Sequence, residues 1–117
     1  MRTINFYRTE SGDCPVEEFL DALSGKQAQK VLWVLRLIEE LESVPQQYFQ
    51  KLVNTEDIWE VRAQFGGDIF RLLGFFAGSS SLILTNGFAK KSQKTPRQEI
   101  DLATRRKNEY LSRQRKK

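Results

Sequence analysis

The residues with the clearest chemical potential in this sequence are cations in the second half of the chain. Two arginines, Arg62 and Arg71, flank a pair of adjacent glycines. Three lysines then lie within five residues of one another, with no acid among them: Lys90, Lys91 and Lys94. An arginine offers a planar fork that matches a phosphate, and a lysine offers a mobile point charge. The pattern therefore indicates a phosphate-bearing ligand.

The position of the two arginines follows from a predicted turn. Gly66-Gly67, between two apolar runs, is a strong signal for a two-residue hairpin turn. With that turn, Phe65 lies opposite Asp68, and Arg62 lies directly opposite Arg71. Like charges opposite one another on a sheet are destabilising by several tenths of a kcal/mol, so we expect them either to pair with acids or to hold an anion.

A second predicted hairpin extends the same face. A turn at residues 78–79, or a loop at 77–80, would place Arg71 opposite Asn86 and return Lys90 to that face. We therefore expect these side chains to converge with Arg62 in one cationic patch. The apolar residues expected on this face farther along are Leu73, Phe75, Leu82 and Leu84.

Such a patch would suit RNA cleavage by attack of a 2′-hydroxyl. The pentavalent phosphate requires stabilisation, which cations can supply, and the reaction also requires a base and an acid. A desolvated lysine crowded by other cations gives up its proton more readily. The lysine candidates for proton transfer are Lys90, Lys91 and Lys94.

Glu60 is a candidate general base, because it lies two residues from Arg62. The alternative is that Glu60 pairs diagonally with Arg71 and that the lysines are merely solvated. The pattern alone favours binding over catalysis, since nothing in it singles out an acid or a base.

Composition narrows the class of protein. We expect one domain spanning residues 1–117, with a mobile basic tail at 112–117. The chain has no histidine and one cysteine, Cys14, so we expect no metal site, no cofactor and no internal disulfide. No long apolar stretch or secretion signal is present, which favours a cytoplasmic protein without a membrane span.

Charge is distributed unevenly along the chain. Residues 1–85 carry 8 Lys/Arg and 12 Asp/Glu, whereas residues 86–117 carry 11 Lys/Arg and 3 Asp/Glu. This asymmetry indicates a polyanion or an acidic protein as partner, unless the basic end is only a solvated tail.

The elements that would position the cations form an α+β pattern. A strand near the N-terminus precedes two amphipathic helices, the second over residues 26–42, where Trp33 is expected in the core. Residues 44–56 are interpreted as a loop. Three antiparallel strands follow, and Thr95-Pro96 predicts the start of a C-terminal helix, with Thr95 as its N-cap. We expect a strand and helical hairpin, a three-stranded meander completing a small sheet, and a final helix.

At these residues the chain resembles the phage-derived HigB-like branch of the RelE/ParE superfamily of bacterial toxins. The similar segments are PVEEFLDAL, IWEVR, FRLLGFF and LILTNGFAKKSQKTPRQEIDLATRR, in family order. The most specific part is G-F-x-K-K-x-x-K-T-P followed by E-I-x-x-A.

The resemblance implies a RelE-like toxin of a type II toxin–antitoxin pair, neutralised by an antitoxin that is typically a helix-turn-helix protein. Many members are ribosome-dependent endoribonucleases that cut mRNA using Arg and Lys. The residues that match the family's catalytic positions are Arg62, Arg71, Lys90 and Lys91. The residues expected to bind RNA phosphates are Lys94, Asn86 and Arg97.

Two positions depart from the family pattern. Asn86 stands where many members of the branch have a histidine before Gly-Phe. The C-terminal tyrosine used by some RelE toxins has no clear counterpart, because Tyr110 lies too far along the helix. Two alternatives therefore remain beside the endoribonuclease: a ParE-like inhibitor of DNA gyrase, and a nucleic-acid-binding protein without catalytic activity.

Overall fold

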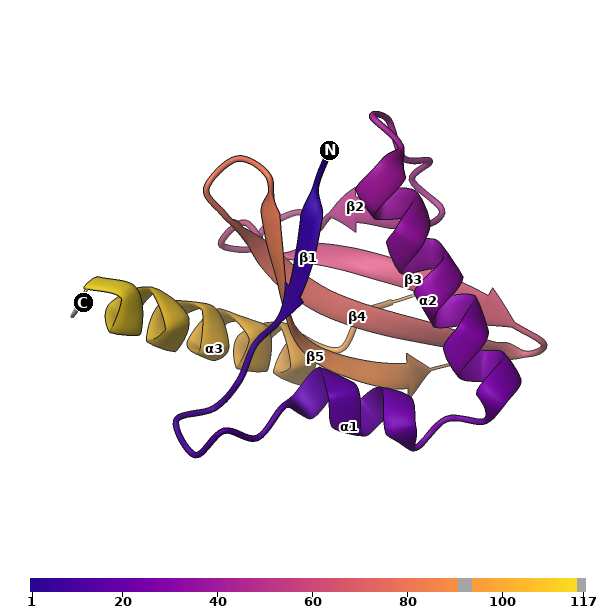
Figure 1. The fold of residues 1–117 in the computed structure, drawn as a ribbon, viewed down its shortest axis with the longest axis horizontal. Coiled ribbons are helices and arrows are strands. Elements are labelled where there is room, and N and C mark those ends of the chain that lie inside the picture. The colour runs from indigo at the N-terminus through magenta and orange to yellow at the C-terminus, as the bar shows by residue number, and fades with distance from the viewer. Residues whose placement is uncertain (91–93, 116–117) are drawn as a thin grey trace.

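The computed structural model describes residues 1–90 and 94–115, and it folds into a mixed sheet with helices on both faces (Figure 1). The elements in chain order are β1 (Thr3–Phe6), α1 (Pro15–Asp21), α2 (Gly25–Glu40), β2 (Phe49–Lys51), β3 (Trp59–Phe65), β4 (Asp68–Ala77), β5 (Ser81–Lys90) and α3 (Arg97–Arg115). The sheet order is β1-β5-β4-β3-β2. The predicted α+β class and antiparallel meander are confirmed, and β1 joins the sheet in parallel with β5.

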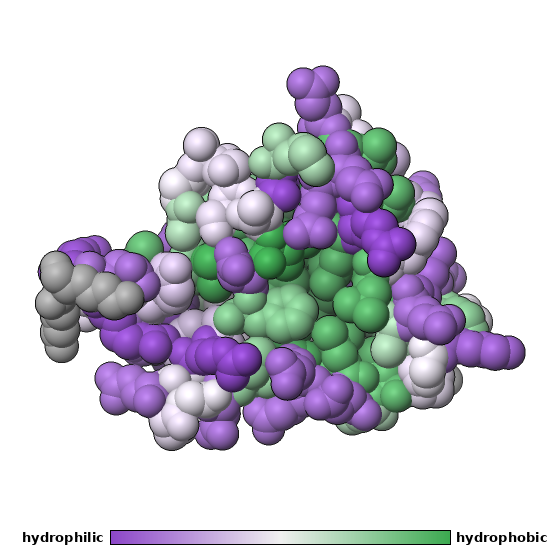
Figure 2. Space-filling model, in the orientation of Figure 1, coloured by the Kyte–Doolittle hydropathy of each residue, from purple (hydrophilic) through white to green (hydrophobic). Residues whose placement is uncertain are grey.

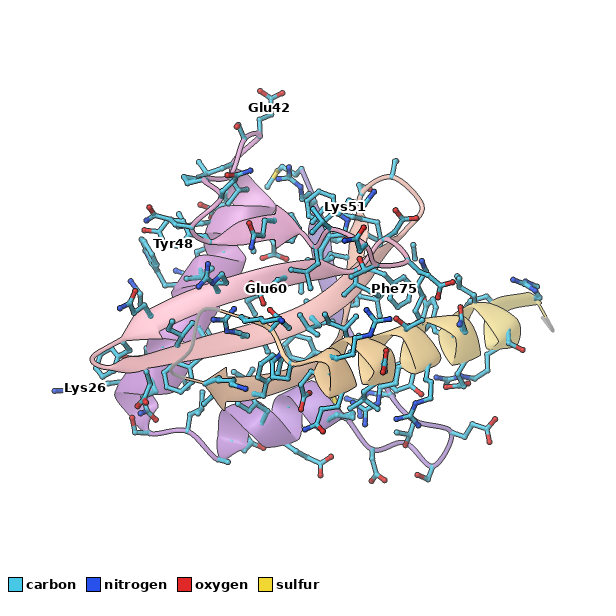
Figure 3. The ribbon with its side chains drawn as sticks, turned by 180° about the vertical axis from the view of Figure 1, so that it is seen from behind. Lys26, Glu42, Tyr48, Lys51, Glu60 and Phe75 are labelled. Atoms are coloured by element: carbon cyan, nitrogen blue, oxygen red, sulfur yellow. The ribbon has the colours of Figure 1, made fainter. Side chains whose placement is uncertain are left out.

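Two apolar layers hold the helices to the sheet. Helices α1 and α2 pack on one face, where Val16, Val34 and Ile38 are completely buried. Helix α3 packs on the other face, which we call the α3 face, where Ala103 lies against Leu73 and Ile58. Figure 3, seen from behind, shows α3 crossing this face. Each sheet face thus buries its own set of alternate side chains.

Three expectations about the elements were wrong. The predicted loop at 44–56 contains the short strand β2, which pairs with the start of β3. Helix α3 continues through Arg115, so most of the expected basic tail is helical, and residues 116–117 lie outside the described part. Trp33 is 43% exposed rather than buried in the core.

The register of the β4–β5 hairpin also differs from the prediction. Ala77 pairs with Ser81, so the turn has three residues, and the register shifts again between Leu73 and Gly74. A change of one residue in register moves side chains to the opposite face. Leu82 and Leu84 therefore pack under α1 and α2 rather than on the α3 face, whereas Leu73 and Phe75 lie on the α3 face as expected.

The bulge at Gly74 depends on the absence of a side chain. A Cβ at this position would lie 2.3 Å from the carbonyl oxygen of Ile83, which belongs to the neighbouring strand and cannot move aside. At the exposed Gly67, by contrast, no atom lies within 4 Å of such a Cβ. The bulge in turn sets which β5 side chains reach the α3 face.

We expect Gly74→Ala to lower the free energy of unfolding by about 1–3 kcal/mol, the usual cost of overpacking. Gly67→Ala is the matched control and should change it by less than about 1 kcal/mol. Urea denaturation of both variants measures the difference. Equal stabilities would show that the bulge tolerates a methyl group.

A polar cluster joins helix α3 to Tyr7, the residue that follows strand β1. The hydroxyl of Tyr7 donates a hydrogen bond to Glu109, and Arg113 forms an ion pair with the same carboxylate. Burial raises the pKa of Tyr7, and the hydrogen bond to Glu109 raises it further. The hydrogen bond from Tyr7 lowers the pKa of Glu109, and Arg113 contributes in the same direction.

These shifts predict a pH dependence of stability. Because the pKa of Glu109 is lowered in the folded state, its contribution is present above its ordinary value of 4.5 and is lost as the pH falls through the folded value. Glu109→Gln should therefore destabilise the protein at pH 7 and much less at pH 3. Urea midpoints of wild type and variant at both pH values measure this. A difference independent of pH would contradict the assignment.

Candidate functional site

The site is built on the α3 face, where three strands bring polar and cationic residues into successive rows. Arg62 pairs with Arg71 in the β3–β4 register, as predicted. The register gives three rows across β3, β4 and β5: Gln64, Ile69 and Lys90; Arg62, Arg71 and Phe88; Glu60, Leu73 and Asn86. Asn86 and Lys90 reach the expected face, but Asn86 lies opposite Leu73 rather than Arg71, because of the longer turn and the bulge.

The carboxylate of Glu60 lies near both arginines and offsets the repulsion between them. Glu60 Oε2 lies 3.1 Å from Arg71 Nη1, and Glu60 Oε1 lies 3.6 Å from Arg62 Nε. The side chains of Glu60 and Arg71 have no exposed surface. This diagonal pair is the alternative that the sequence left open, and it agrees with the rule that buried charges are paired. Figure 3 places Glu60 between the sheet and the start of α3.

Thr95 joins this pair to the C-terminal helix. Its hydroxyl donates to Glu60 Oε2 and accepts from Arg71 Nη1 at 3.4 Å. The first backbone hydrogen bonds of α3 are accepted by the carbonyl of Pro96, so Pro96 occupies the N-cap position. Thr95, which was predicted to be the N-cap, lies one residue before it. The hydroxyl expected to cap the helix is therefore used to fix the start of α3 over the ion pair.

The three charged residues of this cluster differ in access to solvent. Arg62 retains 20% exposure of its side chain, whereas Glu60 and Arg71 retain none. In this arrangement only Arg62 can touch a ligand on the surface. A direct clamp by Arg71, or proton abstraction by Glu60, would require the cluster to open. Glu60 instead lies beside Arg62, and Arg71 lies beside Glu60.

Asn86 also has a structural setting. Its amide nitrogen donates to the Glu99 carbonyl at 3.3 Å and to the Glu99 carboxylate at 3.0 Å, and its Oδ1 accepts from the Thr85 hydroxyl. The residue is 3% exposed. Asn86 therefore ties β5 to the first turn of α3, and it does not join Arg62 at the surface.

The remaining cations are placed differently from one another. Lys90 is exposed at the end of β5, and Lys94 is exposed before α3. Lys91 lies outside the described residues. Arg97 pairs with Asp101 at 3.3 Å and borders a separate hollow of about 410 Å³ that also includes Asn54. Arg62 and Lys90 thus share the α3 face near the β3–β4 turn, and Arg97 is not brought to them.

A hollow of about 400 Å³ adjoins Arg62. Its lining residues are Lys30, Gln47, Tyr48, Arg62, Gln64 and Ile69. Of these residues, the sequence pattern had indicated only Arg62 as part of a site. Gln64 could have been found, because it lies two residues from Arg62 on the same strand face. Tyr48 and Gln47 lie in a segment without periodicity, which carried no signal.

The described residues contain neither a cluster of metal ligands nor a helix suited to cross a membrane. Within 1–90 and 94–115, no group of three or more His, Cys, Asp or Glu side chains is placed to hold a metal ion. In the same part of the chain, no helix combines the length and the apolar character that crossing a bilayer requires.

Comparison with known families supplies the context for this arrangement. Residues 18–108 match the family model described as phage derived protein Gp49-like (DUF891). The chain belongs to this family. It is a toxin family of the RelE/HigB type, and the resemblance found in the sequence motifs is therefore confirmed.

The other comparisons add little to the family match. The archaeal RelE–RelB complex from Pyrococcus horikoshii OT3 contains a chain 18% identical to this Gp49-like protein, with a TM-score of 0.48, over 80% of this chain and 98% of that one. A search of curated proteins found no match.

The buried ion pair generates a prediction for this Gp49-like protein. Glu60→Gln leaves the Arg71 cation buried without its carboxylate, and Arg71→Met leaves the carboxylate without its cation. Each change should lower the free energy of unfolding by about 3–5 kcal/mol. The double variant should lower the free energy of unfolding by clearly less than the sum of the losses in the two single variants. Urea denaturation of all three variants completes the cycle.

The control is an exposed ion pair on the same sheet. Lys51 and Asp57 lie 2.7 Å apart with more than half of each side chain exposed, so Lys51→Ala should change stability little. Additive costs at Glu60 and Arg71 would contradict the coupling between them.

Proposed function

We propose that this RelE/HigB-type toxin is an mRNA endoribonuclease that acts on the ribosome without a metal ion and is neutralised by an antitoxin. The observation that carries the proposal is the placement of Arg62. It is partly exposed, lies 3.6 Å from the carboxylate of the buried Glu60–Arg71 pair, and is on the same sheet face as the exposed Lys90. A buried carboxylate beside a guanidinium favours positions of the cation near it, and such preorganisation is what stabilisation of a developing charge requires.

The proposed roles follow from access to the surface. Arg62 contacts the scissile phosphate, and Arg71 and Glu60 position it from beneath. Lys90 and the neighbouring Lys91 stabilise charge or transfer protons. Lys94 binds a flanking phosphate of the mRNA or of ribosomal RNA.

In the proposed reaction the substrate supplies its own nucleophile. The 2′-oxygen forms a bond to phosphorus while the bond from phosphorus to the 5′-oxygen of the next nucleotide breaks. A base accepts the 2′-hydroxyl proton, and an acid protonates the departing oxygen. The products are a 2′,3′-cyclic phosphate and a 5′-hydroxyl end, and no redox step or cofactor is involved.

A protein partner is supported by the opposite side of the molecule. Figure 2 shows apolar side chains exposed between α1, α2 and β1. A hollow of about 270 Å³ there is lined by Ile4, Phe6, Leu32 and Leu35, with Arg36 and Glu39 beside them, and Leu32 is 47% exposed. Exposed apolar patches commonly mark sites of association. We propose that the antitoxin, a helix-turn-helix protein, covers this surface and leaves the α3 face to RNA.

The proposal is tested by inducible expression in a bacterium, with mapping of RNA ends that carry a 5′-hydroxyl. Wild type should arrest growth and produce new ends within coding sequences. Arg62→Ala should lower cleavage by about 100-fold, the usual effect of removing one donor to a developing charge. Arg105→Ala, an exposed arginine on α3, is the matched control and should cleave like wild type.

Growth arrest with intact transcripts would refute the nuclease. Inhibited DNA supercoiling in the same cells would instead support the gyrase-inhibitor hypothesis. Steeply salt-dependent RNA binding without cleavage would support a binding protein without catalytic activity.

A further inference from the structure

The hollow beside Arg62 lies at an open edge of the sheet. Strand β2 pairs with Trp59, Glu60 and Val61 of β3, and the Arg62 amide then donates to the Tyr48 carbonyl at 2.9 Å. Beyond this bond β3 continues toward its turn while β2 has not yet begun. The hollow occupies this place, between the edge of β3 and the side of α2 that carries Lys30.

The chemistry of the lining favours an anion with a planar, hydrogen-bonding part. Lys30 and Arg62 contribute two cations, and none of the described lining residues is a carboxylate. Gln47 and Gln64 are exposed and offer both amide donors and acceptors. Ile69 provides an apolar floor, and the cation Lys90 lies directly across from it in the register. This combination matches a nucleotide, which joins a phosphate to a base.

One aromatic residue, Tyr48, lines the hollow, and Trp33 supports it from behind. The rings of Tyr48 and Trp33 meet edge to face, with centroids 5.7 Å apart and planes at 86°. The Lys30 ammonium lies 4.4 Å from the centre of the Trp33 ring. These contacts hold Tyr48 and Lys30 in place at the rim. Figure 3 shows Tyr48 at the edge of the molecule, beside α2. Nucleic-acid bases stack readily on such rings.

The size agrees with one nucleotide. A volume of about 400 Å³ lies within the range of small-ligand sites, roughly 300–1,000 Å³. Because Arg62 lines the hollow and is also the proposed phosphate contact, a base seated there would belong to a nucleotide next to the scissile phosphate.

We propose that this hollow is a nucleotide subsite of the RNA-cutting centre. The base lies against Tyr48, Gln47 and Gln64 hydrogen-bond to its edge, and Lys30 and Arg62 hold the adjacent phosphate. The subsite gives the toxin a preference for the nucleotide beside the cut. This inference rests on the proposed RNA-cutting function.

Binding is tested by titrating the isotope-labelled full chain with each of the four nucleoside 5′-monophosphates. NMR spectra of the chain detect the binding. The side-chain amide signals of Gln47 and Gln64 and the ring signals of Tyr48 should shift, with different affinities for the four bases. Inorganic phosphate is the second probe. If it binds as tightly as the best nucleotide, the base makes no contribution and the proposal is overturned.

Variants separate the contacts. Tyr48→Leu keeps apolar bulk against the core but removes the ring. It should lower the affinity for the most tightly bound nucleotide by about tenfold or more. Lys30→Gln should also weaken binding. Lys26→Gln, one turn earlier on α2 and exposed, is the matched control and should bind like wild type (Figure 3). Unchanged affinity in both Tyr48→Leu and Lys30→Gln would overturn the proposal.

The outcome for RNA is measured by the sequences at mapped cleavage sites. Gln64 is exposed, so Gln64→Ala should keep the fold and shift the nucleotide preference beside the cut. A wild type that cleaves, with an unchanged preference in Gln64→Ala and no nucleotide-induced shifts, refutes the subsite alone. A wild type that leaves RNA intact, yet shows nucleotide shifts at Gln47, Gln64 and Tyr48, refutes the nuclease and retains the hollow as a nucleotide site.

Discussion

The ion pair between Glu60 and Arg71 is the interaction on which the α3 face depends. An unpaired charge in the core is very unfavourable, so the two side chains must meet, and the observed β3–β4 register brings them together. Thr95 contacts both partners and thereby fixes where α3 begins. One electrostatic requirement thus couples the central hairpin to the C-terminal helix and leaves Arg62 at the surface.

The same ion pair gives two chemically similar residues, Arg62 and Arg71, different roles. Arg62 and Arg71 face each other on adjacent strands, but one is partly exposed and the other is enclosed. The enclosed arginine neutralises Glu60, whose second oxygen lies 3.6 Å from Arg62 Nε. A buried carboxylate at that distance favours positions of the guanidinium near it, and a side chain with fewer alternative positions loses less conformational entropy when it binds a ligand.

The two faces of the sheet are also different in character. Cations gather at the turn end of the α3 face, whereas exposed apolar groups lie on the side of α1, α2 and β1 (Figure 2). A polyanion and a folded protein could therefore bind without competing for the same atoms. Inhibition by a partner on the apolar side would then act by blocking access to a larger target rather than by filling the cationic site.

The sequence predicted those features that local chemistry determines. Gly66-Gly67 specified the first hairpin, and with it the opposition of Arg62 and Arg71. The second hairpin was misread, because a glycine and two serines do not distinguish a turn of two residues from one of three, and the bulge depends on how closely Gly74 approaches Ile83. The partners of Thr95 and Asn86 depend on where α3 docks, which no local pattern encodes. The position of Tyr48 likewise depends on a tertiary contact, its packing against Trp33 of α2.

The parallel pairing of β1 with β5 has a consequence for when the molecule becomes functional. Thr3 pairs with Ser81, so β1 can enter the sheet only after β5, which lies far along the chain, has been synthesised. Contacts between such distant residues form late, because the loop must close before they stabilise anything. The cationic face also requires Thr95 and α3. A chain that has not yet been synthesised through α3 therefore carries no assembled cationic face.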